Sequence, residues 1–379
     1  MRSYKVNVAQ STLDEIKRRV EAFPWHEMPD DGGWAYGANL EYMRELCDYW
    51  VNEYDWRKHE AELNAYEHFK AEVDGIDLHF IGEQGSGTNR LPLVISHGWP
   101  GSVVEFTGII EQLAHPERFG GSEDDAFDVI APSLPGFGFS GRPPRPYGPR
   151  KIASLFNTLM TETLGYSRYL AQGGDWGGAV SSWLGFDHAD ACAGVHLNIM
   201  IMQTHDGPQN DEERAWSERW SREQEMEQGY RTQQATKPQT LSYAMMDSPV
   251  GIAAWLVEKF NSWSDTQGDD VESAHSKDTL LTNIMVYVIT RTFNTASWIY
   301  FGRREEGGRV MSPEGQRVEV PTAAALFPAE FLSWPPRSYV ERVYNITRWT
   351  EMSRGGHFAA LENPGELAAD IREFARTIR

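Results

Sequence analysis

The sequence predicts an α/β fold, in which a mostly parallel sheet of eight strands is combined with a helical insertion and an N-terminal helical meander. The prediction rests on short apolar runs that alternate with segments of helix length, because crossover helices connect parallel strands. The clearest runs are residues 91–96, 127–133, 169–174 and 193–199. The alternation stops after Ile199, which indicates an insertion at that point.

Composition limits the class of protein. The 379 residues are 40% hydrophobic, enough for one large core or two smaller ones. The chain has 55 acidic and 35 basic residues, and the resulting net charge of -20 disfavours nucleic acid and anionic lipid as partners. Cys47 and Cys192 are too few for a disulfide framework, so we expect a reducing, cytoplasmic compartment. We expect no membrane anchor and no metal or organic cofactor, since the sequence contains no long apolar run, metal-ligand spacing or phosphate loop.

The N-terminal region, residues 1–66, is helical and rich in aromatic side chains by its pattern. Ser11 is the expected cap of its first helix. From Phe69 the pattern changes to period-two alternation, and the dipeptide Asp74-Gly75 predicts the turn of a β-hairpin. This hairpin supplies the first two strands of the sheet.

The four apolar runs supply the next four strands, and the last two are expected at residues 317–327 and 343–350. A closing helix is expected from Pro364, because proline favours the first helical position. The predicted units are an N-terminal meander (1–66), a first core segment (67–202), a helical lid (203–314) and a second core segment (315–379).

The segment GGDWGG, which joins the run at 169–174 to a helical pattern, is the most informative stretch of the chain. A sharp turn from strand to helix needs small residues two before and two after its apex, and Gly173 and Gly177 satisfy this. The apex is Asp175, exposed at a helix N-terminus where an anion is favoured. An Asp at a helix start is also a common N-cap, so the proposed role of Asp175 as nucleophile depends on its partners.

An aspartate at such an apex has a chemical meaning that a serine would not have. Attack by Ser on an sp3 carbon leaves an ether, which water does not readily cleave. Attack by a carboxylate leaves an ester, which water can hydrolyse to regenerate the aspartate. The Asp175 turn therefore predicts attack on an epoxide or an alkyl halide.

Two backbone amides are expected to stabilise the oxyanion of ester hydrolysis. The run at 91–96 leads directly into HGWPG, the position at which α/β-hydrolases place half of an oxyanion hole. The N–H of Trp99, together with that of Trp176 after the nucleophile, would bind the developing charge.

His357 is the expected base, because it lies in a Gly-flanked loop between the last strand and the final helix. The order of nucleophile, acid and base along the chain then agrees with the α/β-hydrolase fold. Glu330, which follows the run at 317–327, is the expected acid that orients His357. Asp206, after the run at 193–199, is the alternative.

With these motifs in place, the chain resembles the epoxide hydrolases of the microsomal and juvenile-hormone type and their soluble bacterial and fungal relatives, including their N-terminal domain. The resemblance extends over nearly the whole chain, which implies an α/β-hydrolase fold. It rests on HGWPGS, SLPGFGFS, GGDWGG, QATKPQT, DSPVGIAAWLVEKF, PTAAALFPAE and RGGHFAALENPGELAADIREF. It implies that Asp175 is the nucleophile, His357 the base and Glu330 the acid.

The resemblance also implies that two lid tyrosines, Tyr230 and Tyr300, hold the epoxide oxygen and donate a proton as the ring opens. A phenol with a pKa of about 10 stays protonated at neutral pH and can do this. The substrate is expected to be an apolar aryl epoxide in secondary metabolism or detoxification. Lid tryptophans suggest this, although they can equally be packing residues: Trp216, Trp220, Trp255, Trp263 and Trp298.

Two other functions remain as alternatives. A haloalkane dehalogenase shares the Asp turn and the following Trp, but a halide leaving group needs no proton from Tyr230 or Tyr300. A non-catalytic binding protein would have no need of a complete set of Asp175, Glu330 and His357. The expected ligands are an epoxide and water, and the sequence leaves the oligomeric state open, a homodimer included.

Overall fold

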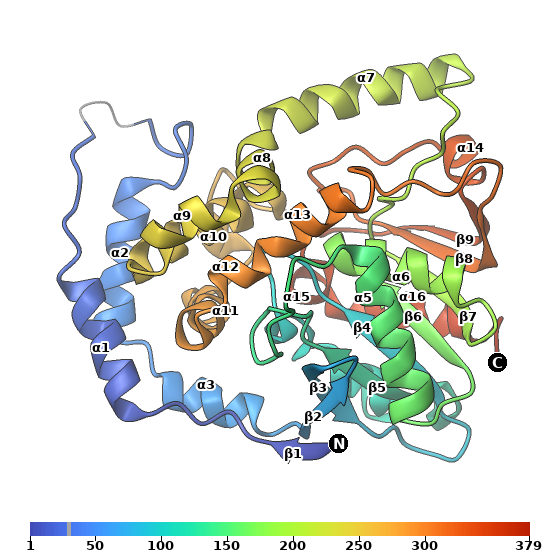
Figure 1. The fold of residues 1–379 in the computed structure, drawn as a ribbon, viewed down its shortest axis with the longest axis horizontal. Coiled ribbons are helices and arrows are strands. Elements are labelled where there is room, and N and C mark those ends of the chain that lie inside the picture. Colours follow the sequence, from blue (N-terminus) through green and yellow to red (C-terminus); the bar gives the residue numbers. More distant parts are fainter. Residues whose placement is uncertain (29–31) are drawn as a thin grey trace.

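A nine-stranded sheet forms the centre of the computed structural model, which describes residues 1–28 and 32–379 (Figure 1). Its strands are β1 (Arg2–Tyr4), β2 (His68–Val73), β3 (Ile76–Glu83), β4 (Leu91–Ser96), β5 (Phe127–Pro132), β6 (Tyr169–Gly173), β7 (Cys192–Leu197), β8 (Val318–Leu326) and β9 (Tyr344–Glu351). Their order is β1-β2-β3-β5-β4-β6-β7-β8-β9. The pairs that join β5, β4, β6, β7, β8 and β9 are parallel, so the predicted mostly parallel sheet is confirmed.

The predicted number of eight strands is wrong, because β1 adds a ninth to the sheet. This strand is antiparallel to β2, with Arg2 opposite Lys70 and Tyr4 opposite His68. It contains only three residues, too few for an alternating pattern to be visible. Its pairing with β2 is a tertiary contact across more than 60 residues of chain, which local sequence does not reveal.

The predicted hairpin is confirmed, with β2 and β3 paired from His68 opposite Ile81 to Val73 opposite Ile76. Asp74 and Gly75 have φ values of 49° and 76°. Positive φ at both central residues is the type I′ geometry, whose twist matches that of the two strands.

Helices cover both faces of the sheet (Figure 1). On one face α5 (Pro149–Thr158) packs against α6 (Asp175–Asp187), which contacts β6 and β7. On the other, α4 (Ile110–Ala114) contacts α16 (Pro364–Ala375). The middle strands are accordingly buried on both sides, which explains their continuous apolar runs. Because parallel strands end at one edge, the loops after β4, β6 and β8 meet there.

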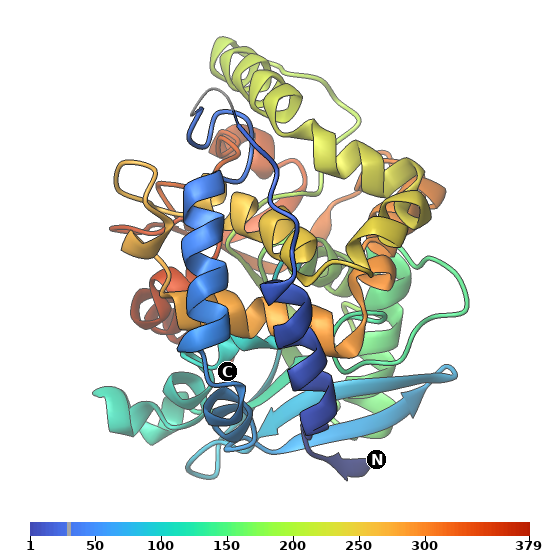
Figure 2. The ribbon, with the colours of Figure 1, turned by 90° about the vertical axis from the view of Figure 1, so that its left-hand side faces the viewer.

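The N-terminal region contains α1 (Gln10–Glu21), α2 (Leu40–Asn52) and α3 (Trp56–Leu63). The prediction that Ser11 caps the first helix is wrong: the helix begins one residue earlier, at Gln10, and its N-cap Ala9 offers no side-chain hydrogen bond. Figure 2 shows α1 and α2 alongside the helices of the insertion.

The insertion between β7 and β8 consists of seven helices in the described chain and covers the carboxyl edge of the sheet (Figure 1). They are α7 (Asp211–Met226), α8 (Gln228–Thr236), α9 (Pro238–Met245), α10 (Pro249–Trp263), α11 (Lys277–Thr290), α12 (Phe293–Ala296) and α13 (Trp298–Glu305). Two short helices, α14 (Arg337–Val340) and α15 (Ala359–Glu362), follow later. None of the helices described is both long and apolar enough to cross a membrane.

Candidate active site

Asp175 lies at the apex of the turn between β6 and α6, with a φ of 46°. This left-handed conformation costs a non-glycine residue of the order of 1 kcal/mol, and such strain is concentrated at functional positions. A Cβ atom at Gly173 would overlap the backbone of Gly177, and one at Gly177 would overlap the carbonyl oxygen of Ser96. The two glycines are therefore required by the close packing of the turn, as the sequence predicts.

The backbone N–H of Trp99 donates a hydrogen bond of 2.8 Å to Oδ1 of Asp175. Gly98 makes this approach possible, since a Cβ there would overlap the carboxylate of Asp175. Trp176 is the second residue of α6, where a backbone N–H has no acceptor within the helix. The Trp99 amide thus points at the Asp175 carboxylate, and the Trp176 amide next to Asp175 in the chain is not used by the helix.

His357 stands between two carboxylates. Its Nδ1 lies 3.0 Å from both carboxylate oxygens of Glu330, and its Nε2 lies 3.3 Å from Oδ2 of Asp175. The bond to Glu330 fixes the ring so that Nε2 faces Asp175, and Nε2 has no hydrogen-bond partner of good geometry in the described chain. The structure thus places Glu330 beside His357, whereas the alternative acid, Asp206, is exposed to solvent.

The two carboxylates control the charge of His357. Burial acts most strongly and lowers the pKa of His357, but the charges of Glu330 and Asp175, and their contacts with the two ring nitrogens, together raise it well above its ordinary value. The imidazole is therefore protonated as long as the Asp175 carboxylate beside it is charged. If Asp175 lost its charge, one of the two causes of the raised pKa would disappear.

Tyr230 of α8 and Tyr300 of α13 face Asp175 across the main cavity. Their ring centroids are 5.7 Å apart, and the ring of Tyr300 lies 4.8 Å from that of Trp176. Tyr300 is fully buried, and its hydroxyl interacts with the side chains of Tyr230 and Trp176 without a well-aligned hydrogen bond in the part of the chain described. Burial first, and then the charge of Asp175, raises the pKa of Tyr230, and burial raises that of Tyr300. Both phenols therefore keep their protons.

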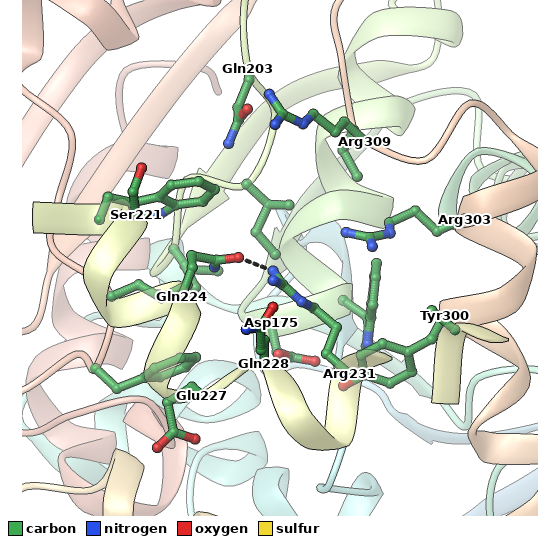
Figure 3. A pocket seen from close by; sticks show the side chains of 18 of the residues that line it. Asp175, Gln203, Ser221, Gln224, Glu227, Gln228, Arg231, Tyr300, Arg303 and Arg309 are labelled. Carbon is green, nitrogen blue, oxygen red and sulfur yellow. Dashed lines mark hydrogen bonds between the residues drawn. The ribbon is translucent and has the colours of Figure 1, made fainter. Parts of the chain in front are cut away.

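The main cavity has a volume of about 730 Å³ and lies between the insertion and the carboxyl edge of the sheet (Figure 3). Asp175 lines it together with side chains of α8 and α13. Of the five lid tryptophans singled out in the sequence, only Trp220 lines it. Trp263 instead packs against Phe331 and His357, so most of these side chains are packing residues.

A second cavity, of about 20 Å³, adjoins the other side of Asp175 and His357. It has room for about one water molecule. Its lining includes the polar side chains of Gln172 and Asn198, which can hold a water beside the carboxylate. Within residues 1–28 and 32–379, no group of His, Cys, Asp and Glu side chains could hold a metal ion.

Sequence reasoning missed Glu362, which fixes the loop that carries His357. Its carboxylate accepts hydrogen bonds from the backbone N–H groups of Gly356 (2.8 Å), Phe358 (2.9 Å) and Asp265 (2.7 Å). Two of these amides flank His357 directly. The only signal in the sequence is a Glu four residues after Phe358, which is indistinguishable from an ordinary helical glutamate.

Comparison with known proteins agrees with this geometry. A family model described as the epoxide hydrolase N terminus matches residues 1–106, and one described as the alpha/beta hydrolase fold matches residues 92–245. The solved structure of Aspergillus niger epoxide hydrolase covers 100% of this chain and 96% of its own, with a TM-score of 0.86 and 28% identity. The fold is thus that of the α/β-hydrolases.

Related sequences identify the family within that fold. A Stigmatella aurantiaca protein whose name contains "epoxide hydrolase" is 40% identical over 99% of this chain and 85% of its own. Epoxide hydrolase 1 of Sus scrofa is 34% identical over 99% of this chain and 88% of its own. The chain belongs to the epoxide hydrolase family and is an enzyme of that class, as the motifs predict.

Proposed function

We propose that this enzyme opens its epoxide to a vicinal diol through an ester on Asp175. The observation that carries the proposal is the position of the Asp175 carboxylate. One oxygen is held by the Trp99 amide and the other lies 3.3 Å from Nε2 of His357, while the two lid phenols stand across the cavity. A nucleophile, a base and two acids thus surround one space.

In the first step, a carboxylate oxygen of Asp175 attacks one epoxide carbon, and the bond between that carbon and the epoxide oxygen breaks. The electron pair goes to the oxygen, which takes a proton from Tyr230 or Tyr300. The buried hydroxyl of Tyr300, which makes no well-aligned hydrogen bond within the described residues, supports this role, because such a donor gains a stronger hydrogen bond when the alkoxide forms. A hydroxyalkyl ester results.

In the second step, His357 removes a proton from water, and the hydroxide attacks the ester carbonyl. Esterification has removed the charge of Asp175, so the pKa of His357 falls, and the proton that the imidazole releases restores the phenol that gave its proton in the first step. The neutral imidazole, oriented by Glu330, can then act as base. The Trp99 and Trp176 amides stabilise the oxyanion. The bond between the ester carbonyl carbon and the substrate oxygen then breaks, and that oxygen takes the hydrogen of the attacking hydroxide. The diol leaves, the Asp175 carboxylate is regenerated, and His357 keeps the proton that it took from water, as at the start of the cycle.

The part of the substrate next to the epoxide is proposed to be aryl. Support comes from the rings around the attack site: Trp99 stacks on Tyr230 at 4.9 Å, and Trp176 meets Tyr300 edge to face. Aryl epoxides arise by oxidation of arenes or aryl alkenes, as happens in secondary metabolism and in detoxification, and we propose that the enzyme acts after such an oxidation.

The test is to mix the His357→Gln variant with styrene oxide and to weigh the intact protein by mass spectrometry, with peptide mapping. We expect a stable adduct of one opened epoxide on Asp175, because the ester forms but water is not activated. The control His26→Gln removes an exposed histidine and should turn over like wild type. No adduct, with diol release by wild type, would mean direct attack by water. An inert wild type would be tested next with larger aryl epoxides and haloalkanes.

A further inference from the structure

Three of the four arginines that line the main cavity have guanidinium groups that lie close together in Figure 3. Arg231 comes from α8, Arg303 from α13 and Arg309 from the loop after α13. Figure 3 shows their guanidinium groups directed into the same part of the cavity, with Gln203 beside Arg309. The cavity therefore has an aromatic wall at the attack site and a cationic wall formed by these arginines.

None of these three arginines forms an ion pair with a carboxylate of residues 1–28 or 32–379. Arg231 donates instead to the neutral side chain of Gln224. Arg303 lies over the ring of Trp176, 5.7 Å from its centroid, and its buried Nε has no hydrogen-bond partner. In a chain with 55 acidic and 35 basic residues, three neighbouring arginines without a carboxylate need an explanation.

The acidic side chains that line the same cavity do not neutralise the arginines. Glu330 is bonded to His357, and Glu227 pairs with Lys259 at 2.8 Å. Glu225 is exposed and makes no ion pair with any of the three. Burial lowers the pKa of Arg303, and the like charge of Arg231 lowers it further. The cluster is thus a site of uncompensated positive charge.

We propose that the cationic wall binds an anionic oxygen group of the substrate, a carboxylate, while the epoxide lies against Asp175. Guanidinium groups recognise carboxylates through paired, charge-assisted hydrogen bonds. A carboxylate at this place would supply the acceptor that Arg303 lacks and offset the repulsion within the cluster. The inference rests on the proposed function and amends its substrate: the aryl part is apolar, but the far end is charged.

The test uses a series of carboxylic acids in which a 4-(oxiran-2-yl)phenyl ring is joined to the carboxylate directly or through one to four methylenes, each compared with its primary amide. Acid and amide have nearly the same size and differ in charge. We expect the ratio of kcat/KM, acid over amide, to exceed about ten at the chain length that reaches the arginines. A ratio near one at every length would overturn the proposal.

Substitutions of single arginines then test whether the arginine cluster recognises the carboxylate. Arg309→Gln, at an exposed position, and Arg303→Gln should each lower the acid-over-amide ratio about tenfold. The matched control Arg222→Gln removes the same charge from an exposed site on α7 that does not line the cavity, and should leave the ratio unchanged. A high ratio that survives both cavity variants would place the anion site elsewhere. Turnover of the amides reports on the epoxide hydrolase mechanism separately, so failure of the two proposals can be distinguished.

Discussion

At the scale of single residues, we expect the two lid phenols, Tyr230 and Tyr300, to determine which leaving group the site can serve. The Tyr300 hydroxyl is buried without a well-aligned hydrogen bond to any described residue, and the raised pKa of each phenol keeps it protonated. An epoxide oxygen needs such a proton when the ring opens, whereas a halide does not. Tyr230 and Tyr300 are therefore the side chains whose loss should separate epoxide opening from other reactions of an aspartate nucleophile.

We predict that Tyr230→Phe or Tyr300→Phe alone lowers kcat for styrene oxide about 100-fold, and that the double variant has no measurable turnover. Loss of general acid catalysis typically costs about 100- to 10,000-fold. The control Tyr243→Phe changes an exposed lid tyrosine and should keep wild-type kinetics. A double variant with more than about a tenth of wild-type kcat would contradict the assigned role.

At the scale of elements, helix α15 fixes the loop that precedes it, and this loop carries His357. Glu362, the last residue of α15, binds amides on both sides of His357, and the N–H of His357 donates to the carbonyl of Trp263 at 2.9 Å. His357 is thus held both by the end of a lid helix and by the core. Any loosening of α15 should affect water activation more than epoxide attack.

We predict that Glu362→Gln lowers kcat about tenfold with little change in KM, because an amide has one acceptor oxygen and leaves a buried N–H unpaired, at a cost of about 1–3 kcal/mol. Rapid-quench mass spectrometry should find the Asp175 ester accumulating during turnover. Glu366→Gln, which removes a carboxylate that binds Ser353 instead, serves as the control. Equal slowing of ester formation and hydrolysis would exclude a role in positioning the base.

The sequence alone predicts those elements whose structure depends on residues that are close together in the chain. The hairpin follows from Asp74-Gly75, and the nucleophile turn from glycines whose absent side chains leave room for the backbone. It was insufficient for β1, which exists only through its pairing with β2. The arginine cluster and Glu362 were also missed, because their meaning depends on how the lid helices and α15 pack, and no short motif encodes that packing.

At the scale of the whole molecule, stability in acid depends on carboxylates buried between elements. Asp370 of α16 is 4% exposed and bonds to His196 of β7 at 2.9 Å and to Arg348 of β9 at 2.7 Å. Burial alone would raise the pKa of Asp370, but these partners lower it from 3.8 to about 2. One carboxylate thus joins two strands of the sheet to the last helix.

A group whose pKa is lowered in the folded state stabilises the protein above its unfolded pKa, and this stabilisation is lost as the pH falls through the folded value. We therefore predict that Asp370→Asn lowers the free energy of unfolding by about 2 kcal/mol at pH 7, and that the difference from wild type shrinks between pH 4 and pH 2. Urea unfolding at a series of pH values measures both. Asp187→Asn, which breaks an exposed pair with Arg150, should cost at most about 1 kcal/mol. A difference for Asp370→Asn that stayed constant down to pH 2 would show that Asp370 acts through packing and not through its charge.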